Sequence, residues 1–549
     1  MTVPHSLTTI LLFFGAQNYI PTQGFDPDNL KLCPSNWDGD SYQNVTMKIA
    51  YGQVPQWLDG HFVAQLSASY GPYGDTAHSV DHLFDAIAAV ARFRIKDGQI
   101  EYSARYYPQQ SYDIWQYYDR DWTKMGWPIQ GGFAPYNETR KKLWDAVPPN
   151  DHGYPPPFVD FWKIGKKIAA GTEFYLLGLT FDPEQLNNFA LNPFKDDPSS
   201  PLADPAVYKF NMPIHARWDK NGVIWNSIAV LNSHDGKMQQ LVFSVQPDGK
   251  RTIEGTYDWG VYDPSLCDQD GNFHGNLSEI WGYMHSITTT ENWVVLPVSS
   301  SPVLWVCSPK PKVIDDLTYP NEWPFDANTP MRFLLFHKTK KIFKLLRGPL
   351  SRLGMHQFNA FEDDQGRIKA DMLSYDNLDA YNKLVRRDHL VGNLFPAVVR
   401  LSRFTLDPEK GTVQEQNLSP FEKFAWEFSQ TNHAYDEKPY HFGYVTTFPF
   451  TTTSAIMKLD FDDPSGAKTL VFEPGNTIAV AEPQFVQTPG KTGEDEGVLL
   501  FRGSDVKKDE TLLFIVNATD MTLIAKASLP GLVTPLGLHN QFYAAKSLQ

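Results

Sequence analysis

Short β-type segments recur along the whole chain past residue 25. They are rich in Val, Ile, Phe and Trp and are bounded by Gly, Asp, Asn or Pro, as strands between turns are. The clearest are the segments 222–231, 292–298, 332–336, 497–501 and 511–516. An all-β chain of 549 residues must protect many strand edges, and radial repetition of small sheets leaves few of them exposed. We therefore predict an all-β fold of the β-propeller type, in one domain over residues 25–549.

Composition narrows the function classes. Hydrophobic residues make up 42% and aromatic residues 14% of the chain, which predicts a large buried interior. The formal net charge is −15, so the surface repels phosphates and nucleic acid is excluded as a partner. The three cysteines (Cys33, Cys267 and Cys307) form no CxxC pair. A transition metal would therefore be held by nitrogen or oxygen.

The N-terminal segment 1–24 is a candidate signal peptide. Its apolar run, 7–16, has the length of a signal core and is too short to span a bilayer. Five glycosylation sequons agree with a secreted or extracellular protein: Asn44, Asn137, Asn276, Asn417 and Asn517. The alternative is a cytoplasmic protein, peripherally associated with membranes, in which this segment stays attached. No other segment is predicted to be a transmembrane helix.

Four of the 15 histidines stand next to β-type segments in apolar or turn contexts: His215, His285, His356 and His539. The first three are spaced by 70 and 71 residues, and 183 residues separate His356 from His539. About 525 residues shared among seven blades give about 75 residues per blade, close to the first two spacings. Such a spacing would let successive blades each direct one imidazole towards a common axis.

These four segments resemble the metal-ligand motifs of the carotenoid cleavage oxygenases, a family that includes animal β-carotene oxygenases and the retinoid isomerohydrolase of the visual cycle. His285 lies in a Tyr-x-His-Ser element, His356 begins a His-x-x-Asn-Ala-Phe-Glu element, and Gly537-Leu-His539 matches the C-terminal element. Around His215 the chain departs from the family, because Pro-Ile-His-Ala replaces Thr-Ala-His-Pro. Further similar blocks, including 81–85, 481–486 and 493–497, extend the resemblance over almost the whole chain.

The resemblance implies a seven-bladed propeller in which a few helices and loops cap the face that carries a substrate tunnel. It also implies one Fe(II) per chain, bound by His215, His285, His356 and His539. Three glutamates of the family orient its ligands, and the matching residues here are Glu173, Glu427 and Glu482. They are expected to orient His285, His356 and His539 respectively, which leaves His215 without a carboxylate partner.

The activity implied by the resemblance is that of an Fe(II)-dependent dioxygenase, which uses O2 to cleave a double bond of a carotenoid or apocarotenoid into carbonyl products. Imidazole suits Fe(II), and four imidazoles leave coordination positions free for O2. A polyene offers no handle for general acid or base work, so we predict no catalytic residue beyond the iron centre. Two alternatives stay open: a retinoid isomerase on the same scaffold, and a non-catalytic polyene-binding protein.

An unusually aromatic segment runs from Tyr106 to Trp127. One interpretation is packing in the core. The other is that this segment borders the tunnel mouth and contacts a membrane, where an apolar polyene would be collected.

Overall fold

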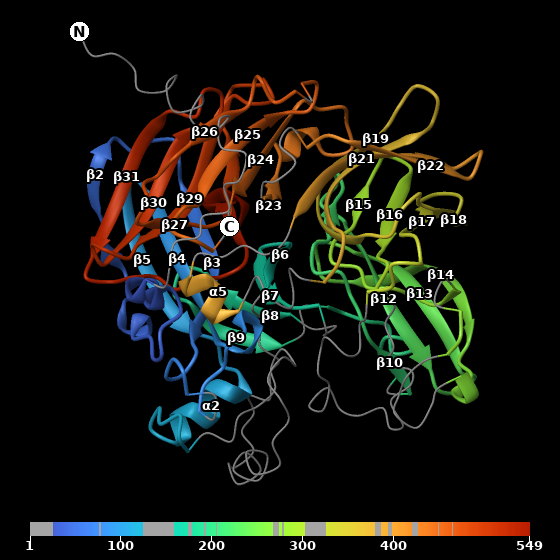
Figure 1. The fold of residues 1–549 in the computed structure, drawn as a ribbon, viewed down its shortest axis with the longest axis horizontal. Helices are drawn as coiled ribbons and strands as arrows, with labels where there is room; N and C mark the ends of the chain where they lie inside the picture. The colour runs from blue at the N-terminus through green and yellow to red at the C-terminus, as the bar shows by residue number, and fades with distance from the viewer. Residues whose placement is uncertain are drawn as a thin grey trace.

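The protein is described by a computed structural model over residues 26–75, 78–124, 159–173, 178–191, 194–204, 206–266, 274–276, 279–301, 325–378, 386–392, 398–419, 426–447, 450–463 and 465–548 (Figure 1). The candidate signal peptide at 1–24, the sequon at Asn137 and the last aromatic residue of the aromatic segment, Trp127, lie outside these ranges.

Seven antiparallel sheets occur in the described residues, and we number them as blades 1 to 7 along the chain. Blade 1 comprises β1 (Val45–Thr46), β5 (Gln99–Tyr106), β4 (Ile87–Lys96), β3 (Gly60–Ser69) and β32 (Asn540–Ala544). Blade 2 comprises β6 (Asp160–Ile164), β7 (Lys167–Gly171), β8 (Leu179–Asp182) and β9 (Asn187–Leu191). Blade 3 comprises β10 (Val207–Lys209), β11 (Arg217–Trp218), β12 (Ile224–Asn232), β13 (Lys237–Val245) and β14 (Arg251–Val261). Blade 4 comprises β15 (Thr288–Thr289), β16 (Trp293–Val298), β17 (Arg332–His337) and β18 (Phe343–Arg347).

The remaining blades follow the same plan. Blade 5 comprises β19 (Leu353–Glu362), β20 (Ile368–Tyr375), β21 (Val399–Asp407) and β22 (Thr412–Asn417). Blade 6 comprises β23 (Trp426–Gln430), β24 (Phe442–Thr447), β25 (Ala455–Asp460) and β26 (Leu470–Phe472). Blade 7 comprises β2 (Lys48–Gly52), β31 (Leu523–Pro530), β30 (Glu510–Asn517), β29 (Gly497–Asp505), β27 (Ile478–Val480) and β28 (Gln484–Gln487). The predicted seven-bladed propeller is confirmed.

The ring of blades is closed twice, once by each end of the chain. The C-terminal strand β32 pairs with β3 in blade 1, with Phe542 opposite Phe62. The N-terminal strand β2 pairs with β31 in blade 7, with Ile49 opposite Ala527. The first strands and the last strands therefore lie side by side (Figure 1). Both closures protect strand edges that would otherwise be open.

Burial falls from the interior of the blades outwards. Every residue of β3, β17 and β29 is buried, because neighbouring blades cover both faces of these strands. The peripheral strands β2 and β22 are mostly exposed. The five segments singled out in the sequence become β12, β16, β17, β29 and β30, so those strand predictions are confirmed.

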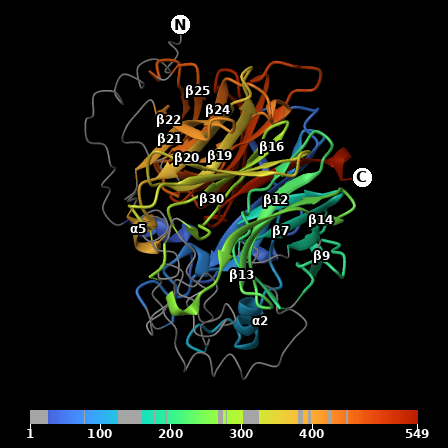
Figure 2. The ribbon, with the colours of Figure 1, turned by 90° about the vertical axis from the view of Figure 1, so that its right-hand side faces the viewer.

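Helices are short. The described α-helices are α2 (Gln110–Tyr117), which lies at one end of the molecule in both views, and α5 (Arg387–Val391) (Figures 1 and 2). The described 3-10 helices span Pro27–Leu32, Gly39–Ser41, Leu83–Asp85, Pro264–Leu266, His433–Tyr435 and Ala545–Ser547. Within the described ranges, none of the helices combines the length and the apolar character needed to cross a bilayer.

The aromatic segment is mainly a packing element. Tyr106, Tyr107, Trp115 and Trp122 are buried, and the Tyr106 and Trp115 rings meet edge to face with their centroids 5.5 Å apart. Tyr117, on α2, is 55% exposed. The buried rings therefore stabilise the domain, and membrane contact by this region stays a prediction.

Candidate metal centre

Residues with ionisable side chains occur at the inner end of every blade. The terminal strands β15, β19 and β23 contact one another in sequence, as do β28, β32 and β6. On or next to the terminal strands of blades 3, 4, 5 and 1 stand His215, His285, His356 and His539 respectively. The other three blades provide carboxylates: Asp160 and Glu173 in blade 2, Glu427 in blade 6 and Glu482 in blade 7. A radial fold thus concentrates residues from the whole sequence around one axis.

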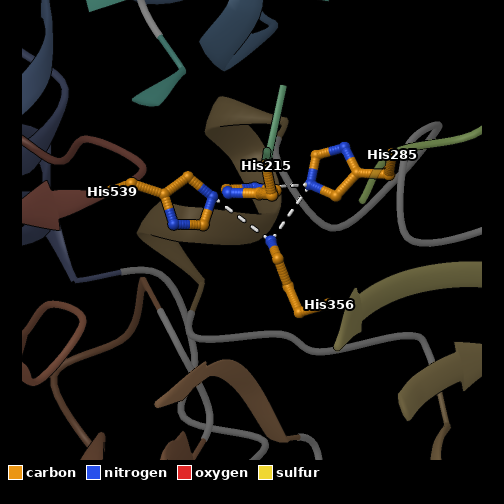
Figure 3. A group of neighbouring side chains, drawn as sticks. All are labelled: His215, His285, His356 and His539. Atoms are coloured by element: carbon orange, nitrogen blue, oxygen red, sulfur yellow. Dashed lines mark hydrogen bonds between the residues drawn. The ribbon is translucent and has the colours of Figure 1, made fainter. Parts of the chain in front are cut away.

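The four imidazoles point towards one another (Figure 3). The Nε2 atoms of His215 and His285 are 3.2 Å apart, those of His285 and His356 3.0 Å, and those of His356 and His539 3.2 Å. One ligand atom from each ring lies within 4.8 Å of all the others. Two nitrogens bound cis to one metal at about 2.1 Å are about 3.0 Å apart. The spacing therefore fits a single metal ion held by all four rings.

Three of the rings contact the glutamates that the resemblance assigns to them. Glu173 Oε1 accepts from Nδ1 of His285, and Glu427 Oε2 accepts from Nδ1 of His356. The distance from His539 Nδ1 to Glu482 Oε1 is 3.0 Å. All three carboxylates are buried. Their effect on metal binding stays a prediction.

The expectation that His215 has no carboxylate partner is wrong. Its Nδ1 lies 2.8 Å from Oδ2 of Asp160, on β6. The residues gave one signal that could have found this contact: Asp160 stands inside an apolar segment, and an aspartate is rarely buried unless it is paired. Its partner is 55 residues away and cannot be inferred from spacing alone.

The contacts with the carboxylates determine which nitrogen of each imidazole carries the proton. A neutral imidazole carries one N–H, and a carboxylate accepts hydrogen bonds, so the proton of each ring lies on Nδ1. Each Nε2 then presents a lone pair to the common point. Four lone pairs at this spacing repel one another, and a cation between them removes the repulsion. The arrangement is a binding site for a single metal ion.

Burial also favours the form of histidine that binds a metal. It lowers the pKa of His215 and of His539 well below the ordinary value, so both rings are neutral at neutral pH. Burial likewise raises the pKa of Glu482 to about 7 and that of Asp160 to about 6. A bound cation opposes both rises by Coulomb attraction. Burial alone would raise the pKa of Glu427, but the His356 ring and the Tyr375 hydroxyl outweigh it and lower that pKa.

Irregular strand pairing sets the direction of two side chains of the centre, those of His356 and Glu427. The register of β19 against β20 shifts on both sides of Gln357, next to His356. That of β23 against β24 shifts between Glu427 and Gln430. Within this second bulge Phe428 has a φ of 61°, a conformation that bulky residues rarely adopt. Bulges of this kind redirect side chains near functional sites, and the Phe428 ring here packs 5.1 Å from that of His539.

Glu427→Gln is expected to weaken metal retention about 10- to 100-fold, because the amide no longer enforces a proton on Nδ1 of His356. The rate at which the metal passes to a chelator measures this. Glu494→Gln is the matched control, since Glu494 is buried and accepts from the backbone N–H of Phe442 outside the centre. Equal release rates for both variants would contradict the assignment.

Comparisons with known proteins agree with the fold and identify the family. The family model described as retinal pigment epithelial membrane protein matches residues 38–544. Mouse β,β-carotene 15,15′-dioxygenase is 23% identical over 532 residues, covering 87% of this chain and 86% of the mouse protein. The carotenoid isomerooxygenase of Galleria mellonella is 22% identical over 499 residues, covering 87% of this chain and 89% of its own. The structure of cobalt-substituted apocarotenoid oxygenase from Synechocystis has a TM-score of 0.70 at 19% identity, covering 95% of this chain and 100% of that one.

Fold and site together define a seven-bladed propeller with a four-histidine centre for a single metal ion. Because the family model spans most of the sequence, the chain belongs to the retinal pigment epithelial membrane protein family, that of the carotenoid oxygenases.

Proposed function

We propose that this protein is an Fe(II)-dependent dioxygenase that cleaves one double bond of a carotenoid or apocarotenoid. The observation that carries the proposal is the set of four converging Nε2 lone pairs, each on a ring that a buried carboxylate orients. Imidazole ligands suit Fe(II), as they suit zinc, copper and nickel, and the family resemblance favours iron among these metals. Relatives that cover most of the chain are named as a carotene dioxygenase and a carotenoid isomerooxygenase, which supports a polyene as substrate.

Bound iron would supply the activation of O2, so that one C=C bond and one O2 become two C=O groups. The chain's own residues hold the ion and limit access to it. The His215 side chain keeps 15% exposure, whereas the other three imidazoles keep 2–9%. The Phe428 ring packs against His356 and His539 and limits access to these two imidazoles. We infer that the apolar substrate approaches from the side of His215.

The decisive test is oxygen dependence. Iron-loaded protein is incubated with β-carotene and with an apocarotenal, in air and without O2, and the products are separated by chromatography. The dioxygenase is expected to form two carbonyl products in air and none without O2. Formation of a geometric isomer, both in air and without O2, would instead support the retinoid isomerase. Unchanged polyene, bound but neither cleaved nor isomerised, would support the non-catalytic carrier.

We also propose a secretory route for the chain and a peripheral membrane contact through the aromatic segment around Tyr117. The apolar run at 7–16 and the exposed sequon residues Asn276 and Asn417 support the first proposal. A shift in mass on glycosidase treatment tests it. Flotation with liposomes tests the second, and protein that stays at the bottom of the gradient would remove it.

A further inference from the structure

Asp160 is held in a fixed orientation at the start of β6. Its Oδ1 accepts from the backbone N–H of Phe161 at 2.7 Å and from Nε2 of Gln541 at 3.4 Å. Its Oδ2 is left for Nδ1 of His215, at 2.8 Å. The side chain is 6% exposed, so water competes little for these contacts. Gln541 lies on β32, two residues after His539, so the aspartate is positioned partly by the strand that follows another histidine of the centre.

The same strand also holds the backbone at His215. The indole Nε1 of Trp162 donates to the carbonyl oxygen of Ile214 at 2.5 Å. On the other side, the backbone N–H of Ile287 donates to the carbonyl oxygen of His215 at 3.2 Å. Backbone and ring are thus fixed separately, the ring by Asp160. His215 is the most exposed of the four imidazoles, so its ring has the greatest need of an anchor.

We propose that Asp160 is a positioning residue of the metal centre, which keeps the proton of His215 on Nδ1 and its Nε2 lone pair directed at the ion. This inference rests on metal binding, the first part of the proposed function. Asp160 also completes a set of four buried carboxylates around the four rings. Each imidazole then has its own carboxylate partner.

Asp160→Asn isolates this role, because it keeps the shape of the side chain and removes the charge. The amide N–H2 can donate to Nδ1 of His215, which would place the ring proton on Nε2 and turn it towards the ion. Loss of such an anchor typically costs about 10- to 100-fold in metal affinity.

The experiment uses the full-length chain loaded with Co(II), whose absorption spectrum reports the ligand field. The rate of Co(II) release to a chelator is measured for the wild type, D160N, E482Q and the control D371N. Asp371 is buried like Asp160 but accepts from Arg403 and Tyr440, away from the centre. We expect release to be about 10- to 100-fold faster for D160N and E482Q, with a changed Co(II) spectrum, and unchanged for D371N. Release from D160N at the wild-type rate, with E482Q accelerated, would overturn the inference.

A measurement on the wild type covers the case in which D160N does not fold. In zinc-loaded protein with 15N-labelled histidine, His215 is expected to show a hydrogen-bonded Nδ1 proton, assigned through its loss in His215→Gln. A His215 ring protonated on Nε2 would overturn the inference. The proposed function has a separate test. If Co(II) is held as expected but iron-loaded protein cleaves no polyene, the proposed function is wrong and the role of Asp160 stands. If the wild type binds no metal, both fall.

Discussion

His356→Gln is expected to reduce polyene cleavage strongly and to abolish stable metal retention. The Nε2 atom of His356 lies 3.0 Å from that of His285 and 3.2 Å from that of His539, so its ring stands between two others in the centre. Its removal leaves three nitrogens and deprives the buried Glu427 of its imidazole partner. Metal catalysis contributes several kcal/mol, so cleavage should fall on the order of a thousand-fold. Metal analysis of the purified variant and product formation in air measure the two effects.

The control is His337→Asn. His337 is buried on β17, where its Nδ1 accepts from the backbone N–H groups of Thr339 and Lys340, outside the centre. The asparagine oxygen can accept in place of Nδ1, so metal content and activity should be those of the wild type. A His356→Gln variant that keeps its metal and its activity would refute the four-histidine centre.

Gly537→Ala is expected to destabilise the fold and the metal centre together. An added Cβ would lie 1.6 Å from the carbonyl oxygen of Gln65 and 2.9 Å from Cα of Leu66, both in the backbone of β3. No side-chain rotation relieves this contact, so the segment 536–539 must move. That segment is joined to β3, because the backbone N–H of Gln65 donates to the carbonyl oxygen of His539 at 3.0 Å. We expect the free energy of unfolding to fall by about 3 kcal/mol or more, and metal retention to be impaired.

Gly366→Ala separates steric conflict from backbone strain. Gly366 has a φ of 73° and nothing within 4 Å of an added Cβ, so alanine there meets only the strain of a left-handed conformation, about 1–2 kcal/mol. Its metal retention should be unchanged. Chemical denaturation measures the stability of the two variants, and chelator competition measures how well each retains the metal. Full metal retention in Gly537→Ala would show that the backbone near His539 adjusts without moving the ring.

The sequence predicted the features that leave local patterns. Strands such as β17 and β29 are short apolar segments between turns, and the four histidines stand in recognisable motifs. The closures by β2 and β32 leave no such pattern, because strand pairing depends on partners more than 450 residues away. The spacing of His215, His285 and His356 did predict their positions on successive blades, whereas the place of His539 in blade 1 follows from the closure by β32.

Asp160 shows where resemblance alone misleads. The family motifs supply three glutamates and imply that His215 has no carboxylate partner, and Asp160 lies outside those motifs. The apolar surroundings of Asp160 were a physical signal independent of the family, since an ionisable group inside a strand needs a partner. Its partner is His215, which only the three-dimensional fold brings next to it, because β6 lies beside the segment before β11.

The double closure of the ring has a consequence for biosynthesis. His539 precedes the strand that completes blade 1, and blade 7 needs β2 from the opposite end of the polypeptide. A nascent chain that does not yet contain residues 539–544 lacks one imidazole and the strand that pairs with β3. The four-histidine centre is therefore complete only after His539 and β32 have been synthesised, and contacts of such long sequence separation make the final assembly slow. A bound ion would mark a polypeptide in which β32 has paired with β3 and brought His539 to the centre.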